Sequence, residues 1–246
     1  MDTIAKPFYL LWKIYFLLIF LLAFLVLFPF YLVIFTFGER PFNFGFKLMK
    51  WHSWFISLMT LTQFKFDGKE EFPEPPYIVC SNHSSYTDIV YSYCFIPDYF
   101  VFLAKKELGN IPGFNVFFKA MNILVDRRNP VEAKKSIEIC SQRIDEGESI
   151  IIFPEGTIPN HTPKMKSFKN GPFKLAIEKQ VPIVPVTFAD NYKRMSEGSW
   201  WGKAGPGKAR VFIHSAIFTN GMTQEDLVSL KKQTFDSIAA PIIEHQ

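Results

Sequence analysis

Residues 14–37 form a run of 24 residues without a single charged side chain. A helix needs roughly 20 apolar residues to cross the hydrocarbon core of a bilayer, so the run is long enough. It exceeds the apolar core of a secretory signal, about 7–15 residues, and no small-residue cleavage site follows it. Pro29 predicts a kink inside the run. The sequence therefore predicts a membrane helix that either crosses the bilayer or bends within one leaflet at Pro29.

A second apolar stretch, Phe42 to Phe66, follows a turn marked by Gly38 and Pro41. Its large apolar residues recur at helical spacing, and lysines lie near its start. This pattern is typical of an amphipathic helix in the membrane interface. The alternative is the first core helix of a soluble domain. We expect residues 1–66 to form a hydrophobic membrane module of two helices and residues 67–246 to form the main domain.

The charge distribution agrees with this division. Residues 1–66 hold 14 of the 28 phenylalanines and 6 Lys/Arg against 2 Asp/Glu, a net charge of +4. The other residues hold 27 − 6 = 21 basic and 23 − 2 = 21 acidic side chains, a net charge of zero. Apolar surface beside basic residues suits an anionic membrane. A neutral main domain argues against nucleic acid as a partner, since it has no charge excess to neutralise phosphates.

From residue 67 onward, short apolar runs alternate with amphipathic stretches. Strands are predicted at 76–81, 99–103, 122–126, 149–153, 182–188 and 208–213, and helices at 86–95, 113–120, 130–146, 170–180 and 223–239. The strands are continuously apolar, which is typical of a sheet covered on both faces. We therefore predict an α/β fold with a mostly parallel sheet flanked by helices, whose chemistry gathers at the carboxyl ends of the strands.

The segment Asn82–Asp88 (NHSSYTD) follows a predicted strand and opens a predicted helix. His83 then lies in the loop, and Asp88 in the first helical turn can fold back to accept the imidazole Nδ1–H. Such a contact fixes the tautomer and leaves Nε2 as a base. The alternative is a loop histidine beside an aspartate placed for the helix dipole.

Other polar residues follow neighbouring predicted strands. Glu155 and Gly156 lie in the turn Phe153–Thr157 (FPEGT), and Lys166 belongs to the basic loop after it. Lys105 ends one strand and Arg127 ends another. Several strands thus deliver His, Glu, Lys or Arg to one edge of the sheet, which suits an anionic substrate.

The blocks NHSSYTD, KKELGNIPGF, VDRR, FPEGT and VPIVPV, in this order, resemble the glycerolipid acyltransferase family, and bacterial 1-acyl-glycerol-3-phosphate acyltransferases in particular. The resemblance spans about residues 76–188. It implies transfer of an acyl group from acyl-CoA or acyl-ACP to a lysolipid hydroxyl. His83 would be the general base and Asp88 would orient it. The substrate-binding positions would be Asn82, Lys105, Arg127, Glu155, Gly156, Thr157 and Lys166.

The resemblance implies no cofactor and no metal ion. The three cysteines are far apart and form no CxxC pair, so they indicate neither a zinc site nor a disulfide framework. Acyl carrier protein is an expected partner if it is the donor. The expected location is the cell membrane, with the active site facing the cytoplasm because thioester donors are found there.

One position departs from the family pattern. The family usually has Arg after Glu-Gly-Thr, where this chain has Ile158. Because that Arg binds phosphate, the departure leaves the acceptor open between 1-acyl-glycerol-3-phosphate, giving phosphatidic acid, and a lyso-aminolipid without phosphate. A membrane-associated hydrolase that uses His83 on water and a non-catalytic lipid-binding protein are the other readings.

Overall fold

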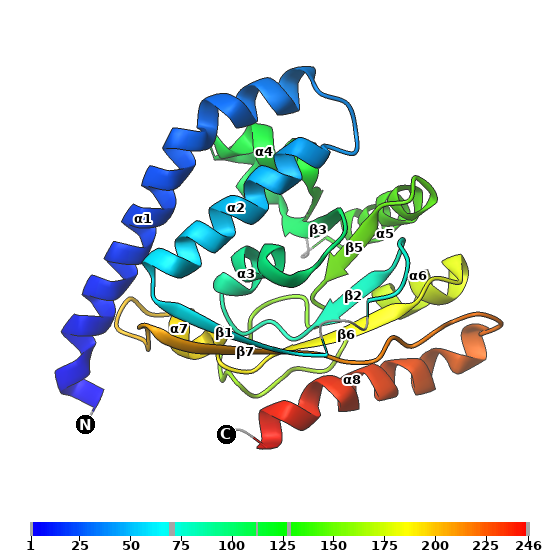
Figure 1. Ribbon diagram of the computed structural model, residues 1–246. Coiled ribbons are helices and arrows are strands. Elements are labelled where there is room, and N and C mark those ends of the chain that lie inside the picture. The colour runs from blue at the N-terminus through cyan, green and yellow to red at the C-terminus, as the bar shows by residue number, and fades with distance from the viewer. Residues whose placement is uncertain (1, 69–71, 112, 127–128, 245–246) are drawn as a thin grey trace.

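The computed structural model describes residues 2–68, 72–111, 113–126 and 129–244, and it contains a seven-stranded sheet with helices on both faces (Figure 1). The strand order is β1-β7-β6-β2-β5-β3-β4. Every pair is parallel except β6 with β7. The predicted α/β fold with a mostly parallel sheet is therefore confirmed.

The six predicted strands are present, with ends within a few residues of those expected: β2 (Ile78–Ser81), β3 (Phe100–Lys105), β4 (Ile123–Val125), β5 (Ser149–Ile152), β6 (Ile183–Phe188) and β7 (Gly207–Ile213). The five predicted helices are α3 (Thr87–Phe95), α4 (Phe114–Met121), α5 (Pro130–Asp145), α6 (Gly171–Lys179) and α8 (Leu227–Glu244). Short helical segments join them: η1 (Lys106–Asn110), α7 (Asn191–Arg194) and η2 (Gln224–Asp226).

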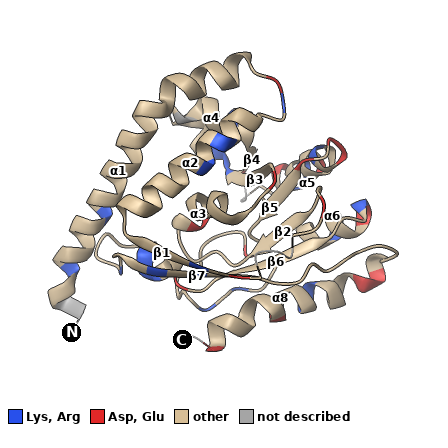
Figure 2. Ribbon diagram, in the orientation of Figure 1, with Lys and Arg blue, Asp and Glu red and all other residues tan. Residues whose placement is uncertain are grey.

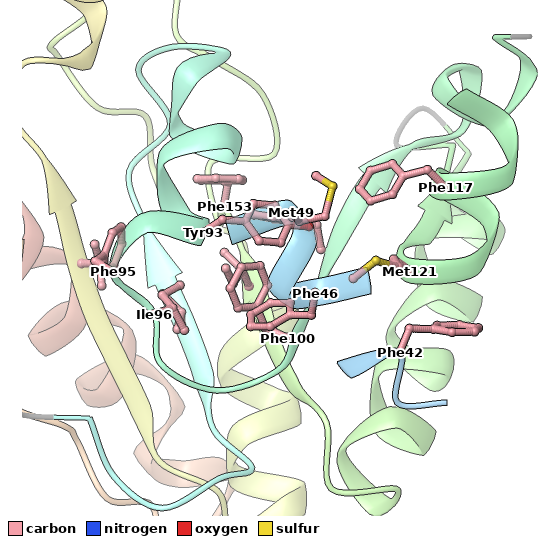
Figure 3. Packing of buried hydrophobic residues seen from close by; sticks show 14 of the residues in the cluster. Phe42, Phe46, Met49, Tyr93, Phe95, Ile96, Phe100, Phe117, Met121 and Phe153 are labelled. Atoms are coloured by element: carbon pink, nitrogen blue, oxygen red, sulfur yellow. The ribbon is translucent and has the colours of Figure 1, made fainter. Parts of the chain in front are cut away.

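Alternate residues of the central strands enter two separate cores. Val79 of β2 points into a phenylalanine-rich core together with α1, α2 and α4, whereas Ile78 and Cys80 point into an aliphatic core with α6 and α8. Period-two alternation between two apolar layers is what a two-sided sheet requires. Figure 3 shows the first of these cores, in which Phe46 and Met49 lie among Tyr93, Phe100 and Phe117.

The N-terminal segment forms two long helices, α1 (Asp2–Phe37) and α2 (Asn43–Met59), which pack side by side over one face of the sheet (Figure 1). Figure 2 shows how few charged residues these helices carry. Residues 4–37 of α1 are long and apolar enough to cross a membrane. One face of α1 packs against the rest of the molecule through Phe16, Phe24, Leu27, Tyr31 and Phe35, which are all buried.

One local expectation differs from the structure. The stretch 42–66 is not one helix, since α2 ends at Met59 and residues 62–67 form an edge strand, β1 (Thr62–Asp67), paired in parallel with β7. Its side chains alternate between half-buried and exposed, which fits an edge strand and not a helix. Helix α1 continues through Pro29, and Figure 1 shows it bending toward its C-terminal end, which agrees with the predicted kink.

Candidate active site

The site forms where two neighbouring parallel strands end. β2 pairs with β5, so the loop carrying His83 and the turn carrying Glu155 leave the sheet side by side. β6 lies on the other side of β2, and it brings Asn191 to the same edge. The topology therefore assembles residues that are far apart in the sequence at the carboxyl ends of the strands, as parallel sheets require.

His83 and Asp88 make the predicted contact. Nδ1 of His83 lies 2.9 Å from Oδ2 of Asp88, and both side chains are buried. Because the carboxylate only accepts, it assigns the Nδ1 proton and leaves the Nε2 lone pair available. Among the described residues, none forms a hydrogen bond with Nε2.

Asp88 is held in place by four further donors. Its Oδ2 accepts the backbone N–H groups of Ser84 at 2.6 Å and Ser85 at 2.9 Å. Its Oδ1 accepts from Nδ2 of Asn191 at 2.8 Å, and the Ser84 hydroxyl lies 3.4 Å from the same oxygen. A carboxylate with this many donors is fixed in orientation.

Phe153 and Glu155 fix the histidine from the β5 side. The Phe153 ring stacks on the imidazole with centroids 4.0 Å apart and an interplanar angle of 14°. Oε1 of Glu155 accepts the backbone N–H of His83 at 2.8 Å, and Oε2 accepts that of Lys166 at 2.7 Å. Burial raises the pKa of the Glu155 carboxyl, although both of these N–H donors act in the opposite direction. Glu155 thus ties the histidine loop to the basic loop.

Three further predicted substrate-binding residues lie around the His83–Asp88 pair in different environments. Asn82 is buried and pairs with the backbone of Phe188 through both ends of its amide, at 3.0 and 2.8 Å. Gly156 has a φ of +78°, and a Cβ there would lie 2.8 Å from Nζ of Lys169. Thr157 is exposed at the cavity described below. In this structure Asn82 and Glu155 therefore position the loops, and their contact with a substrate stays a prediction.

The predicted cations are distributed unevenly. Lys105 is exposed, lines the cavity, and lies 3.4 Å from Glu107. Lys166 contributes its backbone N–H to Glu155, while its side chain is exposed. Arg127 lies outside the described residues. Lys169, whose side chain packs beside Gly156, brings a second cation close to the site.

A cavity of about 290 Å³ extends from His83 beneath the N-terminal helices. Phe20 and Phe24 of α1 and Met49 and Ile56 of α2 line one side of it. The rest of the wall comes from α3, β3, α4 and the turn after β5, and it includes Phe102, Phe117, Phe153 and Ile158. A second pocket, of about 620 Å³, shares Phe20, Tyr86, Ile89, Val90, Leu108, Phe118 and Glu197 with it. His83 thus lies in the wall of an apolar cavity that adjoins the N-terminal helices.

Two residues that hold the pair were missed from the sequence. Asn191 is 103 positions from Asp88, and nothing in its neighbourhood indicates a contact. Phe153 belongs to the predicted apolar strand 149–153 and is buried, but its ring also packs on the His83 imidazole. The placement of Phe153 directly after an apolar strand and before Pro154-Glu155 was the available signal.

Comparison with known proteins gives the family of the chain. A family model described as acyltransferase matches residues 63–189. The 1-acyl-sn-glycerol-3-phosphate acyltransferase alpha of Mus musculus is 31% identical over 170 residues, which covers 66% of this chain and 58% of the relative. The chloroplastic 1-acyl-sn-glycerol-3-phosphate acyltransferase BAT2 of Brassica napus is 30% identical over 193 residues, covering 77% of this chain and 54% of the relative. The chain therefore spans little more than half the length of these relatives.

The fold has a solved counterpart. The crystal structure of the 1-acyl-sn-glycerophosphate (LPA) acyltransferase PlsC from Thermotoga maritima superposes with a TM-score of 0.75 and 23% sequence identity, covering 99% of this chain and 97% of that one. The likeness therefore includes α1 and α2 as well as the sheet. The family match over residues 63–189 shows that the chain belongs to the acyltransferase family.

Proposed function

We propose that this protein transfers a fatty acyl group from acyl-CoA or acyl-ACP to the hydroxyl of 1-acyl-glycerol-3-phosphate, giving phosphatidic acid. The observation that carries the proposal is the His83–Asp88 pair in the wall of an apolar cavity. The relatives named as 1-acyl-sn-glycerol-3-phosphate acyltransferases support this choice of acceptor.

In the proposed mechanism, Nε2 of His83 takes the proton of the acceptor hydroxyl as its oxygen attacks the thioester carbonyl. The tetrahedral intermediate collapses with cleavage of the C–S bond, and His83 returns the proton to the leaving thiolate. Asp88 holds the second imidazole proton on Nδ1 and stabilises the transient imidazolium. The products are an ester and a free thiol.

Direct attack without an acyl-enzyme is supported by the surroundings of His83. Among the described residues, no hydroxyl or thiol is hydrogen-bonded to Nε2, so no enzyme nucleophile is paired with the base. The three cysteines are buried, and burial raises the pKa of Cys94 and Cys140 to about 12. A thiol with such a pKa is a poor nucleophile at neutral pH.

Replacement of Lys105 tests whether the site recognises a phosphate group on the acceptor. If its ammonium contacts that phosphate, Lys105→Ala should raise KM for lysophosphatidic acid roughly tenfold, the effect of losing one charged hydrogen bond at an exposed site. The KM for a phosphate-free lyso-aminolipid should not change. Lys134→Ala is the matched control, because Lys134 is exposed on α5. Equal KM changes for both acceptors would remove Lys105 from phosphate recognition.

A second acceptor class has one observation in its favour. Ile158 is buried and lines the cavity at the position where the family resemblance leads one to expect a phosphate-binding arginine. The same chemistry on a lyso-aminolipid would need no cation there. Acylation of a lyso-aminolipid in preference to lysophosphatidic acid would establish this alternative.

The proposal includes a membrane-bound location at the cell membrane with the site facing the cytoplasm. Many large apolar side chains of α1 and α2 are exposed to solvent in the isolated chain: Ile4, Phe8, Leu11, Leu18, Leu22, Leu25, Val26, Phe30, Val33, Phe37, Phe44, Trp51, Trp54 and Leu58. Exposed apolar surface of this extent is typical of a membrane-binding face. Because the opposite face of α1 packs on the domain, seating in one leaflet explains the arrangement better than a free crossing helix.

Three exposed leucines of α1 test this membrane face. Leu18→Ser/Leu22→Ser/Leu25→Ser should weaken binding to phosphatidylcholine vesicles containing phosphatidylglycerol by about a hundredfold, at roughly 1 kcal/mol per leucine. Flotation with the vesicles measures the change. The control replaces Val228 and Ile243 by serine, because both are exposed on α8, which covers the other face of the sheet (Figure 1). If only the control lost vesicle binding, the membrane would contact the α8 face, and the proposed membrane face on α1 and α2 would be wrong.

A further inference from the structure

Two buried polar groups stand out in the wall of the His83 cavity. Nε2 of His52 and Nδ2 of Asn122 are both inaccessible to solvent and have no hydrogen-bond partner within the described part of the chain. Both residues line the cavity, and their exposed fractions are 1% and 7%. Buried polar atoms are nearly always paired in folded proteins, so a ligand in the cavity that reaches these two atoms would supply the partners that they lack.

The hydrogen bond made by Nδ1 of His52 shows which ring nitrogen carries the proton. The ring forms a hydrogen bond with the backbone of Phe20 in α1, and Nε2 is the unpaired atom, so the bond is made by Nδ1. A ring that donates to a backbone carbonyl carries its proton on Nδ1 and presents a lone pair at Nε2. Burial among the Phe20 and Phe24 rings lowers the pKa of His52 to about 4, so the ring is neutral at pH 7. Nε2 of His52 therefore needs a hydrogen-bond donor as its partner.

Asn122 has the opposite requirement. Its Oδ1 accepts from the backbone N–H of Phe102 at 3.4 Å, which leaves the Nδ2 amino group at the other end of the amide. An amide nitrogen can only donate, so Asn122 needs an acceptor. The residue follows α4 directly and precedes β4, where the wall of the cavity passes from helix to strand.

We propose that this cavity binds an acyl chain that carries a hydroxyl group, hydrogen-bonded to His52 Nε2, to Asn122 Nδ2 or to both. A hydroxyl donates once and accepts up to twice, so it can meet the needs of either residue. A ketone only accepts and can serve Asn122 alone, and an unsubstituted chain can serve neither. That an acyl chain occupies the cavity rests on the proposed function, whereas the preference for a hydroxyl rests on the two unpaired atoms.

The test is binding of free fatty acids to the full-length protein, which needs no acyl transfer. A series of hexadecanoic acids, each with one hydroxyl at a different carbon, competes with a fluorescent fatty acid. The best member should bind about tenfold tighter than hexadecanoic acid, the effect of one hydrogen bond in a desolvated site. The matching keto acid should gain less wherever His52 is a partner, because a ketone cannot donate to Nε2. Equal affinity of the whole series and hexadecanoic acid would overturn the proposal.

Variants assign the preference to the two residues. At least one of His52→Leu and Asn122→Leu should reduce the hydroxyl preference while hexadecanoic acid binds at least as tightly as before. Met49→Leu is the control, since it changes another wall residue without changing a polar group. A preference that survives in the folded double variant would also overturn the proposal.

The transfer reaction then shows which chain carries the hydroxyl. Hydroxyhexadecanoyl-CoA with plain lysophosphatidic acid forms one arm, and hexadecanoyl-CoA with a hydroxylated lysophosphatidic acid forms the other. A faster rate in either arm identifies the chain in the cavity. If no acyl transfer occurs with any pair, the proposed function fails, and the binding series still decides the preference for a hydroxyl.

Discussion

Replacement of His83 by glutamine is expected to lower kcat for acyl transfer by about 10²- to 10⁴-fold, the usual contribution of a positioned general base. Glutamine can still hydrogen-bond to Asp88, but it cannot take the proton of the acceptor hydroxyl. The stacking partner Phe153 and the Glu155 bond to the backbone N–H are retained, so the thermal unfolding temperature should change little. Initial rates with labelled acyl-CoA and lysophosphatidic acid measure the effect.

His161→Gln provides the control, because His161 is exposed in the loop between β5 and α6. It should leave kcat unchanged. A folded His83→Gln protein that transfers acyl groups at a rate comparable to wild type would rule out His83 as the base.

The second large effect is expected from Asp88→Asn, which should lower kcat by about 10²- to 10⁴-fold because the imidazolium loses its counter-charge. The fold should survive. The asparagine can direct its carbonyl oxygen toward His83, Ser84 and Ser85 and its amino group toward Asn191. Oδ1 of Asn191 is buried and unpaired among the described residues, so a turn of that amide lets it accept the new N–H.

The matched control for charge removal is Asp98→Asn. The Asp98 carboxylate accepts the Tyr77 hydroxyl at 2.9 Å outside the site, so this change removes a hydrogen-bonded carboxylate of the same type. It should not affect kcat. Comparable losses in both variants would mean that Asp88 acts through stability, and the unfolding temperature of each variant distinguishes the two explanations.

The helices and strands that have a clear local hydrophobic pattern could be predicted from the sequence. Continuous apolar strands such as 149–153 and amphipathic helices such as 130–146 appear within one or two residues of their expected ends. The His83–Asp88 contact was also predictable, since five residues across the start of a helix bring the two side chains together.

Other features depend on tertiary contacts that no local pattern reveals. The residues of β1 were predicted as part of one helix over 42–66, because Phe64 and Phe66 fit the pattern of a helix as well as that of a strand. Only the pairing with β7, which is distant in the sequence, makes this segment a strand. The buried Glu155 was expected to contact an acceptor, yet its carboxylate receives two backbone N–H groups, one of which lies 72 positions earlier in the chain. Which backbone groups a buried carboxylate meets is set by the fold and not by the residues around it.

Acyl transfer to a lysolipid at His83 can be measured directly. The most direct measurement supplies the purified protein with labelled acyl-CoA or acyl-ACP and offers lysophosphatidic acid and a lyso-aminolipid side by side. We expect labelled phosphatidic acid as the main product, formed with release of one free thiol per ester and lost in the His83→Gln variant. Release of labelled fatty acid without either acylated lipid would identify a hydrolase and contradict this expectation.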